Sequence, residues 1–432
     1  MRRGIRKISI SAPSVKGSTK TPSTAILGFV MRFFIPGTHP ALSLAELSAV
    51  LGSETDFSRG GSEAFLIATD RDAGELQARL GGIVKIGRIV GELPRYNAQG
   101  AIDLITPFAL KTAEASEGKI IYGLSVYALG NKGIAAQIKN DRQRIGLELK
   151  KRLKETGRSV RYVDSKESDL SAVIVTENGL IESAGEYCLI AAADRVYVGQ
   201  TEAVQDYKDW SRRDYGRPAS DPESGMLPPK LARMMVNLGV GHWALGAGKT
   251  IMDPFCGSGT VLMEAGLLGF DLIGNDIEAK AVADTKKNLA WINLEAEILH
   301  GDASDIGKRV VGSVDVVVTE PYLGPPRLKK PTPKEIGLLV GKLMTLYERA
   351  FGSIFTLLPA GGRSVVAFPV FETTEHRLFL PIVALAKKLG LEIVNPIPDS
   401  APIAFKERTQ NGGLLYRRPD AIVSREILIL RK

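Results

Sequence analysis

The segment Ile251–Thr260, which reads Ile-Met-Asp-Pro-Phe-Cys-Gly-Ser-Gly-Thr, carries the clearest chemical pattern in this sequence. Its apolar beginning is typical of a β-strand, and its last residue is placed to open a helix. Gly257 and Gly259 let the backbone turn tightly between the two elements and approach a ligand closely. Because open α/β sheets bind ligands at the carboxyl ends of their strands, the segment predicts a ligand-binding turn.

Two nucleotide-binding patterns fit this turn poorly. A dinucleotide fingerprint has the spacing G-x-G-x-x-G, and its third glycine position is Leu262 here, which disfavours a nicotinamide or flavin dinucleotide. A phosphate-binding loop has the spacing G-x-x-x-x-G-K-[ST] and follows a strand. Gly248–Thr250 supplies only the second half of that pattern, the first position is Trp243, and the segment precedes a strand. We interpret it as a turn.

Acidic residues follow three successive predicted strands. Asp253 lies beside the glycine turn, Asp276 ends the second strand 23 residues later, and Asp302 follows the third strand. S-adenosylmethionine needs a carboxylate near its ammonium group, a polar group near its adenine and an acid at its ribose diol, as dinucleotides do. Asp253 alone could be a helix cap and Asp302 alone a turn residue, but three acids in register favour this ligand. The predicted contacts of the cofactor are Asp253, Phe255, Gly257, Gly259, Asp276, Ile277, Asp302 and Ala303.

The fourth predicted strand ends in Thr319-Glu320-Pro321-Tyr322. A proline followed by an aromatic residue fixes a rigid turn at the same edge of the sheet and offers a ring face for stacking. The alternative is a proline turn that only ends the strand. We predict these four residues as the catalytic group.

Repeated β–α units must position these turns. Strands are predicted over residues 250–252, 271–275, 297–299, 314–319, 363–368, 392–394 and 424–430, and helices over 260–268, 278–292, 334–357 and 377–389. Apolar strands that alternate with helices predict a parallel, doubly wound, Rossmann-like sheet over residues 231–432.

Residues 31–200 are predicted to form a separate α/β region. Its strands are expected over residues 32–35, 64–68, 82–90, 120–127, 159–163, 171–176 and 187–198, and its helices over 43–52 and 134–155. Ser43 and Glu46 have the spacing of a capping box. Residues 201–230 lack periodicity and interleave aromatic residues with arginines, which indicates a linker that also contacts the active site.

Charge alone gives little support for a nucleic-acid partner. The chain has 432 residues and a formal net charge of +8, but residues 1–45 hold seven basic residues and no acid, which leaves the rest at +1. The predicted helix and its flanks, residues 132–161, hold ten Lys and Arg against three acids, and a basic loop spans 327–334. Both suit a phosphate backbone. The predicted RNA contacts are Lys139, Arg142, Lys150, Lys151, Arg327, Lys329 and Lys330.

The remaining composition narrows the protein class. Two cysteines, Cys188 and Cys256, and four scattered histidines exclude a cysteine-built zinc or iron–sulfur site and disfavour a histidine-rich metal site. So few cysteines indicate a reducing compartment, and we expect a cytoplasmic protein. The longest apolar runs are too short to span a membrane. Residues 1–30 are predicted as a disordered basic tail: a nucleic-acid arm, a presequence, or an extension ahead of a start at Met31.

The motifs together resemble a known family. The turn at Asp253–Thr260 and the Pro-Tyr step after the fourth strand resemble class I S-adenosylmethionine-dependent methyltransferases that act on exocyclic amino groups of bases. Four further segments are similar to the archaeal and eukaryotic tRNA guanine-N2 methyltransferases that modify guanosine 10: Arg213–Pro218, Gly225–Leu231, Tyr416–Asp420 and Arg425–Ile427.

This resemblance implies a donor, a substrate and a domain order. The donor would be S-adenosylmethionine, the acceptor the N2 amine of a guanosine in tRNA, and the N-terminal half a THUMP-like, tRNA-binding region. Val160–Val163 and Asp169–Val175 look like late strands of that region. A small activating protein partner is a further expectation, and the sequence leaves the oligomeric state open.

One departure from the family concerns the catalytic motif. The family has Asp-Pro-Pro-Tyr where this chain has Thr319-Glu-Pro-Tyr322. In those enzymes the acid and a proline carbonyl accept hydrogen bonds from the target amine. Here we expect the flipped guanine to stack on Tyr322 and to offer its amine to Thr319 or Glu320. Two alternatives stay open: an adenine-N6 methyltransferase on DNA or RNA, and a non-catalytic RNA-binding protein with a degenerate methyltransferase fold.

Overall fold

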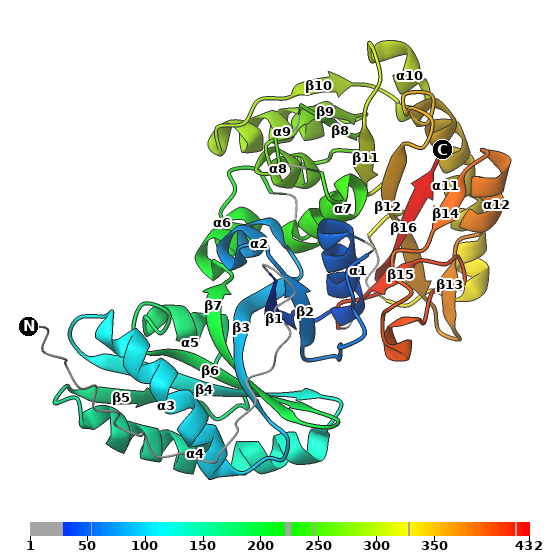
Figure 1. Cartoon of the computed structure of the whole chain (residues 1–432). Coiled ribbons are helices and arrows are strands. Elements are labelled where there is room, and N and C mark those ends of the chain that lie inside the picture. The colour runs from blue at the N-terminus through cyan, green and yellow to red at the C-terminus, as the bar shows by residue number, and fades with distance from the viewer. Residues whose placement is uncertain are drawn as a thin grey trace, which may run out of the picture.

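The computed structural model describes residues 29–52, 54–220, 226–243, 245–246, 248–326, 329–419 and 421–432. Residues 1–28 of the predicted basic tail and the predicted RNA contact Arg327 lie outside these ranges. The described chain forms two β-sheets with helices packed on them, so the predicted mixed α/β fold is confirmed (Figure 1). Within these ranges, no helix combines the length and the apolar character that a membrane crossing requires.

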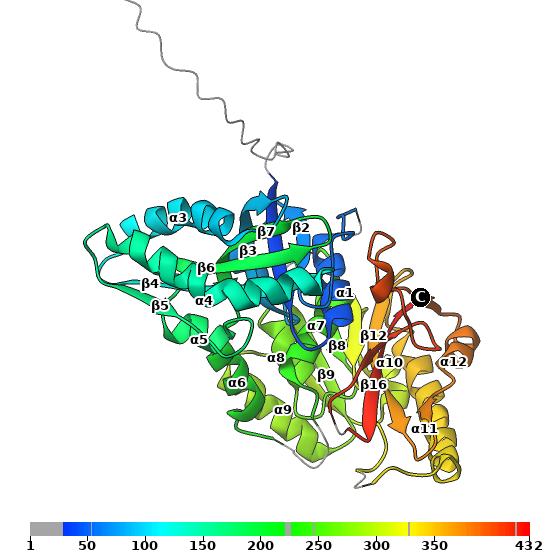
Figure 2. The same ribbon diagram turned by 90° about the horizontal axis from the view of Figure 1, so that it is seen from below.

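The N-terminal sheet has seven strands in the order β2-β1-β3-β7-β6-β4-β5. The strands are β1 (Val30–Pro36), β2 (Phe65–Thr69), β3 (Ile83–Leu93), β4 (Ile120–Leu129), β5 (Val160–Val163), β6 (Gly185–Ala192) and β7 (Val196–Val204). Helices α3 (Ala98–Glu114) and α4 (Lys132–Lys154) lie side by side on one face of this sheet (Figure 2). Their apolar residues cover β4 and β6 because they recur on one face of each helix. The basic residues of α4 are thereby left mostly on its outer face.

The C-terminal sheet orders its main strands β10-β9-β8-β11-β12-β16-β14. The strands are β8 (Thr250–Asp253), β9 (Asp271–Asp276), β10 (Glu297–His300), β11 (Val316–Thr319), β12 (Arg363–Glu372), β14 (Glu392–Val394) and β16 (Val423–Arg431). The predicted parallel order holds from β10 to β12, but β16 is antiparallel to both of its neighbours. The reason is a hairpin, since β15 (Leu414–Tyr416) pairs antiparallel with β16 and returns the chain into the sheet from its carboxyl edge.

Helices cover both faces of the C-terminal sheet. On one face pack α7 (Pro229–Val240), α8 (Thr260–Gly266) and α9 (Ala279–Trp291), and on the other α10 (Ile306–Arg309), α11 (Pro333–Ile354) and α12 (Ile382–Lys388). This doubly wound arrangement leaves the carboxyl ends of β8, β9, β10 and β11 at one edge. The predicted ligand turns therefore meet there.

Several local predictions are wrong, each for a local reason. Residues 171–176 form helix α5 (Ala172–Glu177) because the Ser171 side chain caps it by accepting from the Ile174 N–H. The region predicted as a linker contains helix α6 (Tyr207–Tyr215), which Asp206 caps in the same way. The helix predicted over 377–389 divides at Pro381 into strand β13 (Arg377–Phe379) and α12. Helix α3 was not predicted from the sequence.

The two halves share a buried polar junction. Helix α1 (Pro40–Leu51) starts after His39, so the capping box predicted at Ser43 and Glu46 is wrong. The Glu46 carboxylate is fully buried and instead accepts from the N–H groups of Gly81 and Gly82, which follow α2 (Ala73–Arg79), each at 2.8 Å. Asn237 of α7 donates to the same carboxylate at 2.7 Å. The start of the N-terminal half is therefore fixed against the C-terminal half, between it and the helices α3 and α4 (Figure 1).

Candidate active site

The glycine turn after β8 is held in a left-handed conformation. Gly257 has φ 52° and Gly259 has φ 84°, values that favour glycine. A Cβ atom on Gly259 would lie 3.0 Å from the Thr285 side chain, so that glycine is also needed for close packing. A Cβ atom on Gly257 would meet none of the described residues within 4 Å. The turn is therefore packed on one side and open on the other.

Asp253 ends β8 and lies in a part of the site from which solvent is excluded. Its side chain is 2% exposed, and Oδ1 accepts from the Thr319 hydroxyl at 2.6 Å and from the Phe255 N–H at 3.1 Å. Burial raises the pKa of the Asp253 carboxyl from its ordinary 3.8 to about 7, and the two hydrogen bonds oppose this only in part. A buried carboxylate of this kind gains from a cationic ligand.

The raised pKa predicts a pH dependence of donor binding. Because the folded-state pKa of Asp253 lies above its unfolded value, this group stabilises the fold at acid pH, and the stabilisation is lost as the pH rises through about 7. A ligand that carries an ammonium group prefers the ionised carboxylate, so its affinity is expected to rise up to about pH 7 and then level off.

Titration calorimetry checks this expectation. At about pH 6, binding of S-adenosylmethionine should release up to one proton, seen as a dependence of the heat on the ionisation enthalpy of the buffer. Asp253→Asn should remove that release. A heat that is independent of buffer in the unaltered protein would contradict the assignment of this group.

Hydrogen bonds join the turns after β8, β9 and β10. Asp276 accepts from the Gly257 N–H at 2.8 Å and from the Glu278 N–H at 3.0 Å. The Asn275 amide donates to the carbonyl oxygens of Pro254 and Gly301 at 3.1 and 3.0 Å. The structure thus brings the three predicted acid-bearing turns together. No role for Asn275 was predicted from the sequence, because only the acid beside it, Asp276, was considered as a ligand contact.

The other predicted donor contacts lie around these turns. Ile277 is 60% exposed, Phe255 is half-buried and Ala303 is buried at the start of a short helical turn. Asp302 accepts from the Ser304 N–H at 2.8 Å, and this bond is the main cause that holds the pKa of Asp302 below its ordinary value. Asp302 is therefore an ionised turn residue at the edge of the site.

The four predicted catalytic residues have different surroundings. Thr319 is fully buried and Pro321 is buried, whereas Tyr322 is 53% exposed. The Tyr322 carbonyl accepts a hydrogen bond from the Tyr347 hydroxyl of α11 at 2.6 Å, which fixes the backbone of the turn against that helix. The exposed ring is thus carried on an anchored backbone.

Glu320 is held by Arg425 of β16. Arg425 donates from Nε to one carboxylate oxygen and from Nη2 to the other, the second at 3.1 Å. Both side chains are mostly buried. This pair favours Thr319 over Glu320 as the acceptor of a target amine. The sequence contained the Arg425–Ile427 motif, but no spacing rule links it to Glu320.

The linker packs against the glycine turn. Asn288 donates to the carbonyls of Ala219 and Ser258, both at 2.8 Å, and Arg217 donates to the Thr260 hydroxyl at 2.6 Å. Glu264 of α8, which is fully buried, accepts from Arg213 and Arg233 at 2.8 and 2.9 Å. Residues 213–219 therefore form one wall of the candidate donor site.

The predicted RNA contacts divide into exposed and buried side chains. Lys139, Lys151, Lys329 and Lys330 are exposed and Lys150 is half-buried. The prediction that Arg142 contacts RNA is wrong. Its side chain is only 6% exposed, and its guanidinium binds the carbonyls of Ser165 and Glu167 and the Asp164 carboxylate. Arg142 lies on the inner side of helix α4 and fixes the loop after β5.

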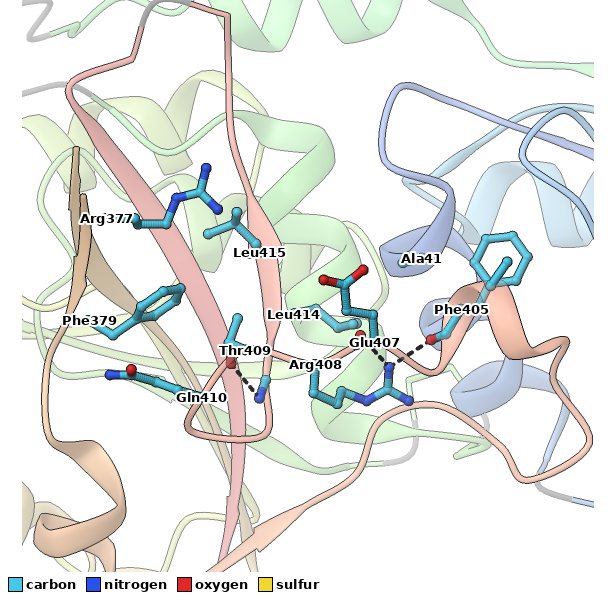
Figure 3. Close-up of a pocket in the computed structure, with 12 residues that line it drawn as sticks. Ala41, Arg377, Phe379, Phe405, Glu407, Arg408, Thr409, Gln410, Leu414 and Leu415 are labelled. Carbon is cyan, nitrogen blue, oxygen red and sulfur yellow. Dashed lines mark hydrogen bonds between the residues drawn. The ribbon is translucent and has the colours of Figure 1, made fainter. Parts of the chain in front are cut away.

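Two cavities lie outside the predicted catalytic residues. One, of about 470 Å³, lies between β13, β15 and the segment 404–410, where Arg408 donates to the carbonyls of Phe405 and Glu407 (Figure 3). The other, of about 580 Å³, lies between the N-terminal half, α6, α7 and β15. His39 of the N-terminal half and Tyr416 of β15 stack on its wall at 4.2 Å between ring centroids.

Comparison with known proteins finds similarity in the C-terminal half of the chain. Residues 217–369 match the family described as UPF0020, RMKL-like, methyltransferase domain. Among curated proteins, the chain is 34% identical over 215 residues to a tRNA (guanine(10)-N2)-dimethyltransferase of Methanothermobacter thermautotrophicus, which covers 48% of this chain and 59% of that relative. A protein of the same name from Pyrococcus abyssi is 32% identical, over 38% of this chain and 43% of that one. The chain thus matches less than two thirds of the length of these relatives.

One further relative and one solved structure complete the comparison. A tRNA (guanine(26)-N(2))-dimethyltransferase of Pyrobaculum calidifontis is 29% identical over 27% of this chain and 37% of that one. The crystal structure of TrmN from Thermus thermophilus superposes with a TM-score of 0.50 at 17% identity, over 93% of this chain and 99% of that chain. At this identity the likeness concerns the fold, which it shares across both halves.

Proposed function

We propose that the chain transfers a methyl group from S-adenosylmethionine to the N2 amine of a guanosine in tRNA, and the starting point is the match of residues 217–369 to the RMKL-like methyltransferase domain. The observation that carries the proposal is the hydrogen bond between Thr319 and Asp253. It joins the turn of the donor motif to the turn of the acceptor motif at one edge of the sheet. The names of the curated relatives support tRNA and guanine N2.

The residues present fit this donor. Asp253 is a buried carboxylate that suits an ammonium group, and Asp276 ends β9, where a ribose diol binds in related sheets. The exposed Ile277 side chain offers an apolar surface for adenine, and Asp302 and Ala303 border its edge. The open side of Gly257 leaves room for a ligand beside the backbone. When bound, S-adenosylmethionine supplies an electrophilic methyl group on a sulfonium.

Thr319 and the turn after it orient the target amine. The Thr319 hydroxyl donates a hydrogen bond to Asp253, so only its oxygen lone pairs remain to accept a hydrogen bond from an amine N–H. Hydrogen bonding to a carboxylate makes this oxygen a better acceptor than a free hydroxyl. Backbone carbonyls at Glu320 and Pro321 complete the acceptor set, and the exposed Tyr322 ring stacks the flipped guanine. Positioning of this kind is the main demand, because the methyl donor is already activated.

We propose that α4 and the 329–334 loop hold the tRNA backbone. Lys139→Glu combined with Lys151→Glu should weaken tRNA binding and lower the slope of log K against log salt by about 2, since each phosphate contact contributes about 1. Lys387→Glu combined with Lys388→Glu on α12 is the matched control, because these lysines are also exposed and lie on the other half of the molecule. Filter binding over a salt series measures both. An equal loss in the two pairs would argue for bulk charge alone.

The second cavity supports an RNA substrate that spans both halves. Its lining joins the stacked His39 and Tyr416 rings to the cationic Arg418 and Lys230. Aromatic and cationic side chains together are the surroundings that unpaired nucleotides favour. A cytoplasmic site of action and a small activating protein partner remain predictions.

Methyl transfer from labelled donor to unmodified tRNA, followed by nuclease digestion and mass analysis, tests the proposal. We expect N2-methylguanosine or its dimethylated form at position 10, with position 26 as the second site that the relatives' names suggest. Label recovered as N6-methyladenosine would favour the adenine-N6 alternative. Binding of tRNA without binding of S-adenosylmethionine would favour a non-catalytic RNA-binding protein.

A further inference from the structure

We infer that Arg217, in the linker ahead of the catalytic sheet, binds the α-carboxylate of the methyl donor. The inference rests on the proposed function, because it takes S-adenosylmethionine as that donor. Arg217 was not among the residues predicted from the sequence to contact the cofactor, and it lies outside the β–α units that carry them.

The guanidinium of Arg217 is buried and only partly satisfied. The residue is 4% exposed, and Nη1 donates to the Thr260 hydroxyl at 2.6 Å and approaches the Ser258 hydroxyl at 3.5 Å. Nε and Nη2 are buried and have no hydrogen-bond partner among the described residues. These two nitrogens form one edge of the planar fork, and that edge matches the two oxygens of a carboxylate.

Neighbouring arginines show what Arg217 lacks. Arg213 and Arg233 share the buried carboxylate of Glu264, which binds one of them with each of its oxygens. Arg217 reaches only hydroxyl groups, and burial lowers its pKa despite the nearby charges of Asp214 and Glu264. A buried cation without a directly bonded carboxylate is costly, and a bound carboxylate would relieve that cost.

The position of Arg217 fits an amino-acid ligand. Its hydroxyl partners, Ser258 and Thr260, belong to the same glycine turn that begins at Asp253. The amino-acid part of the donor carries one ammonium and one carboxylate on the same carbon. Asp253 and Arg217 therefore provide one charge for each, on a turn whose Gly257 leaves open space.

Ligands with and without the carboxylate separate this role from a structural one. Calorimetry would compare S-adenosylmethionine with its decarboxylated analogue, which keeps the ammonium, sulfonium and adenosine. For Arg217→Gln we expect the affinity for S-adenosylmethionine to fall roughly ten- to hundredfold, as for loss of a charge-assisted bidentate contact, and the affinity for the analogue to change less than about twofold. Arg217→Lys should fall between, because it keeps the charge and loses the fork.

Controls keep each outcome decisive. Arg212→Gln alters an exposed arginine of the same linker, which pairs with Asp209, and should change neither affinity. If Arg217→Gln weakens both ligands equally, or neither, the inference is overturned, and the unaltered protein's binding of S-adenosylmethionine still stands as evidence for the proposed donor. If the unaltered protein binds neither ligand, the proposed function itself fails. A variant that loses only tRNA affinity would assign Arg217 to a phosphate and also overturn the inference.

Discussion

Replacing Asp253 by Asn is expected to weaken donor binding and methyl transfer by roughly a hundredfold, as expected for loss of a buried charge from its ionic partner. The carboxylate is 2% exposed, so water cannot replace its interaction with an ammonium group. Asn keeps an oxygen that can accept from the Thr319 hydroxyl and the Phe255 N–H, which preserves the turn. The loss should therefore appear in the affinity for the donor while the protein stays folded.

Asp315→Asn is the matched control for this result. Asp315 lies at the opposite edge of the same sheet, just before β11, where it accepts from Lys249 and from the Thr250 N–H. We expect its variant to bind the donor as the unaltered protein does. Donor affinity and methyl transfer within threefold of normal in the Asp253 variant would contradict the assigned role.

Breaking the Glu320–Arg425 pair is expected to lower kcat by roughly tenfold or more with little change in donor affinity, because removing one partner weakens the compensation of a mostly buried charge. The pair fixes the turn that carries Pro321 and Tyr322, and that turn orients the acceptor rather than the donor. Glu320→Gln and Arg425→Gln are the two single changes. Since the two side chains act as a unit, the double variant should lose less than the product of the single losses.

Thr319→Ala separates orientation of the turn from acceptance of the amine. It removes the proposed acceptor oxygen and leaves the Glu320–Arg425 pair in place, so kcat should fall although the turn keeps its shape. Steady-state kinetics with tRNA and calorimetry with the donor measure the two effects. Full activity in both Glu320→Gln and Thr319→Ala would exclude the proposed acceptor set.

The donor half of the site follows from local sequence. Asp276 ends a strand, the glycine turn and Asp302 follow strands closely, and parallel strands place their carboxyl ends at one edge. The acid that ends a strand can therefore be assigned without long-range information. Asn275, which joins the turns by two hydrogen bonds, needs the three-dimensional arrangement to be recognised.

The acceptor half depends on contacts between distant residues. Glu320 meets Arg425 across 105 positions of sequence, through a hairpin that makes β16 antiparallel. Likewise, Ser43 and Glu46 have the spacing of a helix cap, but Pro40 starts the helix three residues earlier. Ser43 instead donates to the Gly82 carbonyl, and Glu46 accepts from Asn237 of α7. Local spacing predicts what a residue can do, and packing decides which of those roles it takes.

The central claim is tested most directly by two tRNAs that differ only in one amine. One carries guanosine at position 10 and the other inosine, which lacks the exocyclic N2 group but keeps the rest of the base. We predict that labelled methyl is transferred to the first tRNA, is recovered as N2-methylated guanosine, and is absent from position 10 of the second. Label recovered at position 10 of the inosine-containing tRNA, or label recovered on adenosine in either tRNA, would contradict the account.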